Sequence, residues 1–506
     1  MSRFRLLDLL RCLSWAGGLL LAGTGCDATP ARAPRAMATG LPTGRLLPPP
    51  APEPVAPLLR ALLDTAAAGS ARAADAHLGL RTGAAVRAFF GSHPEPAWTA
   101  APAGLPADAM AALALLAGAA DHGLRPADYG LVRLHALRDS LARPGTAGDA
   151  PAQTARQRAQ LELYLSDAVL HFMRDVGRGR LRAHVVPSRE RAAGPAGQPA
   201  AVLRAGLDRH AVPAAMLTGQ PANRDYRQLQ RALAQWLRQP VAPDSAADHR
   251  ARFEQAALNL ERWRWNPLAP DSTYLLINIP ACELVVVARG TVARRHRVIV
   301  GQPATPTPVL SSTIRHFTLA PGWHVPRSIA TREILPALKR DTRYLDRHNM
   351  ALYDRRGRQL DPARVAWARV TAQNFAYTIR QSPGCDCALG NIVFRFANPY
   401  SVYLHDTPVR QLFGLPDRAL SHGCIRLEHP MALAAYLLGR KGNRMRLPTE
   451  EECARQPRAR DIYLARPMTL YVRYATCAGE NGRLRFFADV YRRDEPLRRA
   501  LFGPTL

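Results

Sequence analysis

The C-terminal third of the chain holds a cysteine in a setting suited to covalent chemistry. Cys424 follows His422 and Gly423, and a second histidine, His405, lies upstream. A cysteine thiolate is a strong nucleophile once a base has removed the thiol proton, and backbone N–H groups can receive the charge that forms on an attacked carbonyl oxygen. These residue types predict nucleophilic catalysis at Cys424.

Either histidine could be the base. His422 is two residues from Cys424, and residues with that spacing on an extended segment point to the same side. His405 ends the alternating run 402–405, which predicts a strand, and turn residues such as Pro408 and Gly414 would then return the chain beside it. The spacing alone does not choose between the two histidines.

The order of these residues resembles the signature of the L,D-transpeptidases, the YkuD-type cysteine enzymes that cross-link peptidoglycan. The resemblance rests on His405 and, after a loop, on the run Ser421-His422-Gly423-Cys424 with Arg426 beyond it. It implies that Cys424 is the nucleophile and His405 the general base. It also implies that His422, Gly423 and the Cys424 N–H form the oxyanion hole, with Ser421 and Arg426 supporting the site.

Two other interpretations stay open. A zinc site could be built from His405, His422, Cys424 and His429, although the spacing is irregular and no paired ligand motif supports it. Asp406 could orient the base as the third member of a triad. Because adjacent strand residues point to opposite faces, a turn-capping role for Asp406 is the simpler expectation. We expect no metal and no cofactor.

Trp323, Tyr403 and Asp406 are the candidates for the substrate cleft. Trp323 lies in the segment 321–326, which resembles a Pro-Gly-Trp-like segment of the family, and core packing is the alternative. Tyr403 shares the predicted strand with His405.

The composition excludes some functions. The 506 residues are enough for two or three domains, and the net charge is +28, from 68 Lys and Arg against 40 Asp and Glu. No nucleic-acid-binding module accompanies this charge, so we expect no nucleic acid partner. Attraction to an anionic cell wall and a general compositional bias toward Arg both explain the charge.

The N-terminus predicts export. Arg3, Arg5 and Arg11 precede an apolar run at 13–22 that is short for a membrane span, and small residues follow before Cys26. We expect a signal peptide at 1–26, a Pro/Ala-rich tether at 27–54, and a place in the periplasm or cell envelope. The signal resembles that of bacterial lipoproteins, in which Cys26 would be lipidated; ordinary cleavage or an uncleaved anchor are alternatives.

The remaining cysteines follow no pattern. In an exported protein Cys385 or Cys387 could form a disulfide with Cys282, Cys453 or Cys477, and the sequence does not assign the partner. One such bond could staple the base of the insertion described below. Cys424 must stay reduced if it is the nucleophile.

Residues 55–250 predict an all-α domain. Apolar residues recur at spacings of three and four, with a helix at 161–176 that stops at Gly177 and an amphipathic helix at 226–239. The stretches 121–129 and 165–181 resemble the helical scaffold domain of the large Gram-negative L,D-transpeptidases. This domain could bind envelope partners. A polar linker is expected at 241–249 and a helix at 253–265.

Residues 251–506 predict a mostly β catalytic domain, so the fold class is α+β and multidomain. Strands are expected at 274–279, 283–288, 296–300 and 392–396, with a helical capping insertion at about 328–385. After a helix at 431–438, the segment 441–466 reads as irregular. A hairpin within 468–492 would pair 469–474 with 484–491 across Asn481-Gly482.

The resemblance implies a reaction on peptidoglycan stem peptides. Cys424 would attack a tetrapeptide stem after its third residue and expel the terminal D-amino acid, and an amine of a second stem would resolve the thioester into a 3→3 cross-link. The alternatives are a carboxypeptidase or hydrolase that uses water at the same site, attachment of an envelope protein, and a non-catalytic envelope scaffold.

Overall fold

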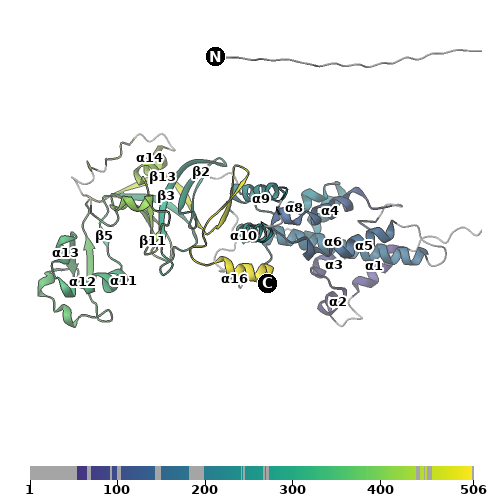
Figure 1. Cartoon of the computed structure of the whole chain (residues 1–506), viewed down its shortest axis with the longest axis horizontal. Helices are drawn as coiled ribbons and strands as arrows, with labels where there is room; N and C mark the ends of the chain where they lie inside the picture. The colour runs from purple at the N-terminus through teal and green to yellow at the C-terminus, as the bar shows by residue number, and fades with distance from the viewer. Residues whose placement is uncertain are drawn as a thin grey trace, which may run out of the picture. The chain divides into compact units, whose positions relative to one another are not determined.

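A computed structural model gives the fold of most of the chain (Figure 1). The described residues are 54–64, 70–91, 94–99, 104–142, 150–181, 199–240, 242, 245–265, 268, 273–384, 386–439, 445–449, 451–452 and 458–503. The predicted signal, nearly all of the predicted tether, Cys26, Cys385 and Cys453 lie outside them. No helix of the described part is both long and apolar enough to cross a membrane.

The N-terminal half is helical, as predicted. Its helices are α1 (Val55–Leu63), α2 (Ala71–Leu78), α3 (Gly83–Gly91), α4 (Ala107–Ala117), α5 (Leu131–Leu141), α6 (Ala150–Arg178), α7 (Pro199–Asp208), α8 (Val212–Leu217), α9 (Arg224–Leu237) and α10 (Ala246–Trp265), with short 3₁₀ turns η2 (Ala119–His122) and η3 (Pro126–Tyr129). Residues 246–249 of the predicted linker belong to α10, and the predicted boundary at 250 falls inside that helix.

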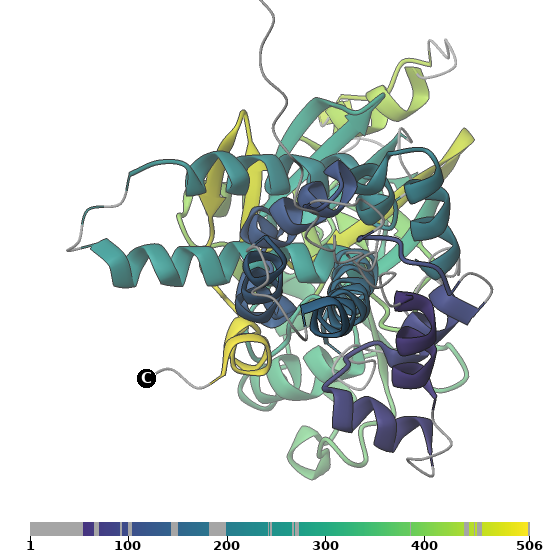
Figure 2. The ribbon, with the colours of Figure 1, turned by 90° about the vertical axis from the view of Figure 1, so that its right-hand side faces the viewer.

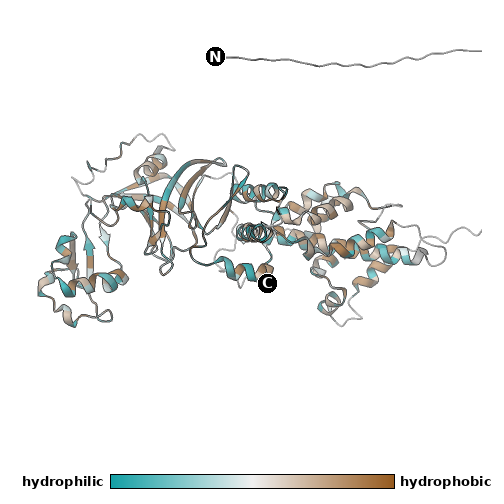
Figure 3. Cartoon of the chain, in the orientation of Figure 1, coloured by the Kyte–Doolittle hydropathy of each residue, from teal (hydrophilic) through white to brown (hydrophobic). Residues whose placement is uncertain are grey.

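Helix α6 is the centre of this half. Its apolar side chains, among them Leu161, Val169 and Phe172, are buried against the surrounding helices, and hydrophobic residues concentrate along α6 and its neighbours (Figure 3). The predicted helix at 161–176 was too short at its start, because α6 begins at Ala150, whereas its end at Arg178 lies one residue beyond the predicted stop at Gly177. A Cβ at Gly177 would lie 3.2 Å from the carbonyl oxygen of Gly219, so the glycine allows a close backbone approach.

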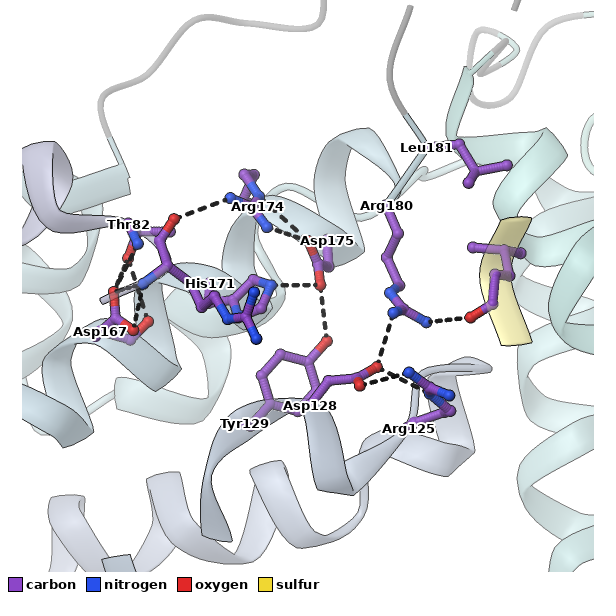
Figure 4. Close-up of polar contacts among 12 residues, drawn as sticks. Thr82, Arg125, Asp128, Tyr129, Asp167, His171, Arg174, Asp175, Arg180 and Leu181 are labelled. Atoms are coloured by element: carbon purple, nitrogen blue, oxygen red, sulfur yellow. Dashed lines mark hydrogen bonds and ion pairs between the residues drawn. The ribbon is translucent and has the colours of Figure 1, made fainter. Parts of the chain in front are cut away.

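Buried carboxylates on α6 fasten other segments to it (Figure 4). Asp167 accepts hydrogen bonds from the backbone N–H and the hydroxyl of Thr82, both at 2.7 Å. Asp175 accepts from the hydroxyl of Tyr129 at 3.1 Å and lies 3.2 Å from His171 Nε2. A buried acceptor that collects several donors is satisfied and fixes the geometry of its partners.

Helices α9 and α10 join this half to the β-rich half. Tyr226 and Leu229 of α9 and Trp263 of α10 share a buried cluster with Tyr274 and other residues of β1 and β2. Trp263 therefore packs against the β-rich half. The C-terminal helix α16 (Asp494–Phe502) lies beside α10 (Figure 2), and Arg180 donates to the Leu501 carbonyl at 3.3 Å.

The main sheet has nine strands in the order β11-β3-β12-β10-β9-β4-β13-β1-β2, and an additional pairing of β2 with β3 closes it on itself. Its strands are β1 (Tyr274–Asn278), β2 (Glu283–Ala288), β3 (Thr291–Gly301), β4 (Leu310–Leu319), β9 (Ile392–Phe396), β10 (Leu404–His405), β11 (Ala419–Ser421), β12 (Ile425–Leu427) and β13 (Arg460–Arg473). Helix α14 (Pro430–Gly439) packs its apolar side into the core that this sheet encloses. The strands predicted at 274–279, 283–288 and 392–396 are confirmed, whereas 460–466, predicted as irregular, belong to β13.

The insertion between β4 and β9 has a core of its own, built around residues such as Leu338, Leu345 and Phe375. Its helices, which were predicted, are α11 (Arg327–Ile329), the π-helical turn η6 (Ala330–Ile334), α12 (Leu335–Arg340) and α13 (Tyr344–Arg347), with 3₁₀ turns at 362–364 and 367–369. It also contains a four-stranded sheet that was not predicted: β5 (Trp323–His324), β8 (Thr378–Gln381), β6 (Met350–Tyr353) and β7 (Gln359–Leu360). These strands are too short to give a clear alternating pattern in the sequence.

The predicted C-terminal hairpin has the expected turn but a different first strand. β14 (Cys477–Glu480) pairs with β15 (Arg483–Phe486) across Asn481-Gly482, while the segment 469–474 lies in β13 of the main sheet. The hairpin packs on α9 so closely that a Cβ at Gly479 would lie 2.2 Å from the Gln228 carbonyl oxygen.

This close approach predicts the effect of a single methyl group. Gly479→Ala should destabilise the chain by about 1–3 kcal/mol, because backbone atoms of α9 cannot move aside as a flexible side chain would. Thermal unfolding measures it, with Gly91→Ala as the matched control, since no described heavy atom lies within 4 Å of a Cβ at that position. Equal melting temperatures for the two variants would contradict the close packing.

Candidate active site

The parallel pairing of β10 with β12 brings the predicted catalytic residues together. Leu404 pairs with Ile425 and His405 with Arg426, and the Ile425 N–H donates to the Tyr403 carbonyl at 3.0 Å. Leu404 and Ile425 are fully buried in the core under the sheet. Because successive residues alternate between faces, the residues that flank them lie together on the opposite face: Tyr403, His405, Cys424 and Arg426.

His405 is buried and held by one nitrogen. Its Nδ1 lies 2.5 Å from the backbone carbonyl oxygen of Asp406, which can only accept a hydrogen bond, so Nδ1 carries the proton and Nε2 is left as the basic nitrogen. Burial first, and then the positive charge of Arg426, lower the pKa of His405 to about 3, although the hydrogen bond to Asp406 opposes the shift. The imidazole is therefore neutral at pH 7 and able to accept a proton.

Asp406 supports His405 through its main chain. Its carboxylate is buried and accepts a hydrogen bond from the Asn391 N–H at 2.9 Å, so it fastens the start of β9. In a triad, the Asp406 carboxylate would accept the hydrogen bond from His405 Nδ1. Here the Asp406 backbone carbonyl accepts that hydrogen bond instead.

Cys424 rests as a thiol. Burial raises its pKa, and hydrogen bonds from the Tyr403 backbone and side chain and the charge of Arg426 offset this only in part. Burial likewise raises the pKa of the Tyr403 phenol, so Tyr403 is neutral too. A neutral thiol beside a neutral imidazole means that proton transfer must accompany nucleophilic attack rather than precede it.

The loop before Cys424 is shaped by Gly423 and Ser421. Gly423 has φ = +112°, a conformation that side-chain-bearing residues rarely adopt. The Ser421 hydroxyl donates to the Cys424 carbonyl at 2.5 Å and accepts from the Gly423 N–H at 3.1 Å. Because the Gly423 N–H already donates to Ser421, it is not free to bind an oxyanion. Of the predicted oxyanion-hole donors, the N–H groups of His422 and Cys424 remain.

Sequence reasoning missed the residues that hold this loop from outside. Thr307 donates its hydroxyl to the Gly423 carbonyl at 2.9 Å and accepts from the Gly301 N–H at 2.8 Å. Tyr491 donates to the Gly301 carbonyl at 2.6 Å and accepts from the Thr307 N–H at 3.1 Å. Thr307 lies in the run Thr305-Pro306-Thr307-Pro308, whose prolines favour a rigid loop, whereas Tyr491 lies far from the motif around Cys424 in the sequence.

His422 faces the insertion. Its Nε2 lies 2.7 Å from Glu333 Oε1 on η6, with both side chains about half exposed. Trp323, at the base of the insertion, is half-buried, and its side chain hydrogen-bonds to Tyr403. Two elements of the insertion therefore meet the residues around Cys424, and Glu333 is a site neighbour that sequence reasoning did not find.

The described residues form neither the zinc site nor the disulfides that the sequence left open as alternatives. Within them, no group of three or more His, Cys, Asp or Glu side chains is arranged to hold a metal ion. Cys282, Cys387 and Cys477 are buried free thiols, so the disulfides considered for them are absent, and Cys424 is also free.

A separate cavity of about 70 Å³, partly open to solvent, lies between α9, the hairpin and β2. Its lining includes Trp263, Phe487 and Arg295, and Cys424 is not part of it. Arg295 is bound to Glu283 at 2.8 Å and to Glu480, so these charges are paired with one another. The cavity is thus a seam between packed elements rather than part of the site.

Comparison with known proteins agrees with this geometry. Residues 272–447 match the model of the L,D-transpeptidase catalytic domain, called YkuD, and this range contains every candidate site residue. Residues 84–233 match the model of the scaffold domain.

Individual proteins are similar to parts of this chain. A protein of Haemophilus influenzae, provisionally named an L,D-transpeptidase, is 32% identical over 276 residues, which are 54% of this chain and 54% of that protein. The chain thus spans about half the length of that relative. The solved L,D-transpeptidase from Mycobacterium smegmatis is 15% identical, with a TM-score of 0.19, over 41% of this chain and 60% of that one. L,D-transpeptidase 1 of Mycobacterium tuberculosis is 15% identical, with a TM-score of 0.16, over 40% and 62%.

The raised pKa of Cys424 predicts its alkylation behaviour. Only the thiolate reacts with iodoacetamide, so the rate at pH 7 should be low and should rise through and above pH 9. Arg426→Gln removes a charge that lowers this pKa and should move the rise to still higher pH. Mass spectrometry of the peptide that contains Cys424 follows the reaction. A rate that stays constant down to pH 5 would indicate a thiolate–imidazolium pair instead.

The contacts of Thr307 predict a rate effect. Thr307→Val keeps the shape of the side chain but leaves the Gly423 carbonyl without its donor, so the loop should shift and acylation of Cys424 should slow by roughly tenfold or more. Thr291→Val is the matched control, because the Thr291 hydroxyl also donates to a backbone carbonyl, at 2.9 Å, in a turn remote in sequence from the loop. Equal acylation rates in the two variants would show that Thr307 does not position the loop.

Proposed function

We propose that the chain is an L,D-transpeptidase that forms 3→3 cross-links between peptidoglycan stem peptides. The observation that supports this best is the shared face of Cys424 and His405 within the catalytic domain, set by the register of β10 and β12. The basic Nε2 of a neutral His405 and a neutral Cys424 thiol are the two partners that general-base catalysis requires.

The proposed reaction begins with acylation. His405 Nε2 takes the Cys424 proton as Sγ attacks the carbonyl carbon of the third stem residue. The N–H groups of His422 and Cys424 receive the oxyanion. The C–N bond to the terminal D-amino acid then breaks, and the leaving amine takes the proton from His405. Each oxyanion donor of this kind is worth roughly a hundred- to a thousandfold in rate.

Deacylation reverses the roles. An amine of a second stem attacks the thioester carbonyl, and His405 takes a proton from that amine as the new C–N bond forms. The C–S bond breaks and the Cys424 thiolate regains a proton. Arg426 is a positioning residue in this scheme, because its charge favours both the thiolate and the neutral imidazole.

The cellular setting is part of the same proposal. A signal at 1–26 would export the chain to the periplasm, with Cys26 as a lipid anchor and 27–54 as a tether. The helical half, which contains the scaffold domain, would bind envelope partners. In that compartment, Cys424 would have access to peptidoglycan as its substrate.

Product mass tests the function. The full chain and a Cys424→Ala control are incubated with purified disaccharide-tetrapeptide, and we expect a dimer that has lost one D-alanine with the full chain alone. His405→Gln should slow this by roughly a hundred- to ten-thousandfold. A monomer shortened by D-alanine would instead establish the hydrolase. No product with either protein under reducing conditions would contradict both enzymatic functions.

A further inference from the structure

A row of side chains leads away from Cys424 across the outer face of the sheet. Tyr403 lies beside Cys424, and because Leu404 pairs with Phe394, Tyr403 lies opposite Arg395 on β9. Arg395 pairs with His316 on β4, and His316 pairs with Tyr463 on β13. We call Tyr403, Arg395, His316 and Tyr463 the cross-strand row.

The side chains of this row contact one another. The Arg395 guanidinium lies 5.9 Å from the centre of the Tyr403 ring, and the rings of His316 and Tyr463 are 5.1 Å apart and tilted by 31°. The pairing of β4 with β9 is irregular between Ile314 and His316. His316 therefore points outward, although Ile314 and Phe317 on the same strand lie in the core.

The row is accessible and carries charge. Tyr463 is 71% exposed, which is unusual for a tyrosine in the middle of a strand, and Arg395 is exposed on a strand whose other side chains are buried. No carboxylate of the described residues pairs with Arg395, whereas many other arginines of the chain are in ion pairs. An exposed guanidinium between aromatic rings suits a ligand that carries both a carboxylate and flat apolar faces.

The distances from Cys424 along the cross-strand row indicate which part of the substrate would lie there. Neighbouring strands are about 4.8 Å apart, so Arg395 is roughly 10 Å from Cys424 and Tyr463 roughly 19 Å. Three extended peptide residues span about 10 Å. In a donor whose third residue forms the thioester with Cys424, the peptide would therefore reach Arg395. The sugar beyond the peptide would reach the rings of His316 and Tyr463.

We propose that the cross-strand row binds the sugar-bearing part of the donor that stays attached to Cys424 after the D-amino acid has left. Arg395 pairs with a carboxylate of the stem, and Tyr463 stacks on a sugar ring. This subsite rests on the proposed function, and it makes the glycan-linked donor, rather than a free peptide, the preferred substrate.

Two donors of different length test the subsite: free tetrapeptide and disaccharide-tetrapeptide. Tyr463→Ala should lower kcat/KM for acylation by the disaccharide-tetrapeptide roughly three- to tenfold and leave that of the free tetrapeptide unchanged. Arg395→Gln should weaken both donors, since its partner is on the peptide. Arg466→Ala is the matched control, because Arg466 is exposed on the same strand where its register with β4 is broken. Equal loss with both donors for Tyr463→Ala, or no loss, would overturn the proposal.

Binding separates this subsite from the proposed reaction. In the Cys424→Ala chain, calorimetry should show tighter binding of the disaccharide-tetrapeptide than of the free tetrapeptide, and Tyr463→Ala should remove that difference. This result would support the subsite even if no product formed. Equal affinity for the two ligands in the Cys424→Ala chain would overturn the subsite, whatever the enzyme produces.

Discussion

The parallel pairing of β10 with β12 is the constraint on which the geometry of the site depends. Only two residues of β10 take part, yet they fix which side chains leave the core and which enter it. Leu404 and Ile425 are buried beneath the sheet, so Tyr403, His405, Cys424 and Arg426 must share its other face. A slip of one residue would bury His405 in the core and expose Leu404, at a cost that the packed interior makes large.

Electrostatics then give each group on that face a defined state. Burial disfavours the charged forms of both Cys424 and His405, and Arg426 lowers the pKa of both, which favours a thiolate but opposes an imidazolium. Arg426 thus stabilises the negative charge that develops on the Cys424 sulfur and keeps His405 neutral before the reaction. The loop at 421–423 depends in turn on Thr307 and Tyr491, and Glu333 links it to the insertion.

The sequence could predict what depends on local pattern. Periodicity predicts the helical and β-rich halves and the strands at 274–279 and 283–288. The motif around Cys424 predicts that His405 lies near it, because the members of the motif are close in sequence. Thr307 and Tyr491 could not be predicted, because they bind Gly423 and Gly301 across 116 and 190 positions of sequence, and hydrogen bonds of this length leave no local signal. The wrong strand was assigned to the C-terminal hairpin because 469–474 is an equally good strand, which pairs with β4 and β1 instead.

The central proposal is a covalent intermediate on Cys424, and the mass of the intact protein tests it most directly. The full chain is mixed with disaccharide-tetrapeptide without an amine acceptor and quenched in acid, and the modified residue is then located by peptide mapping. The proposed mechanism predicts an increase equal to the mass of the donor minus the mass of the expelled D-alanine, carried by Cys424 and lost on addition of an acceptor stem. An unmodified Cys424 under conditions in which product forms, or an adduct on another residue, would contradict it.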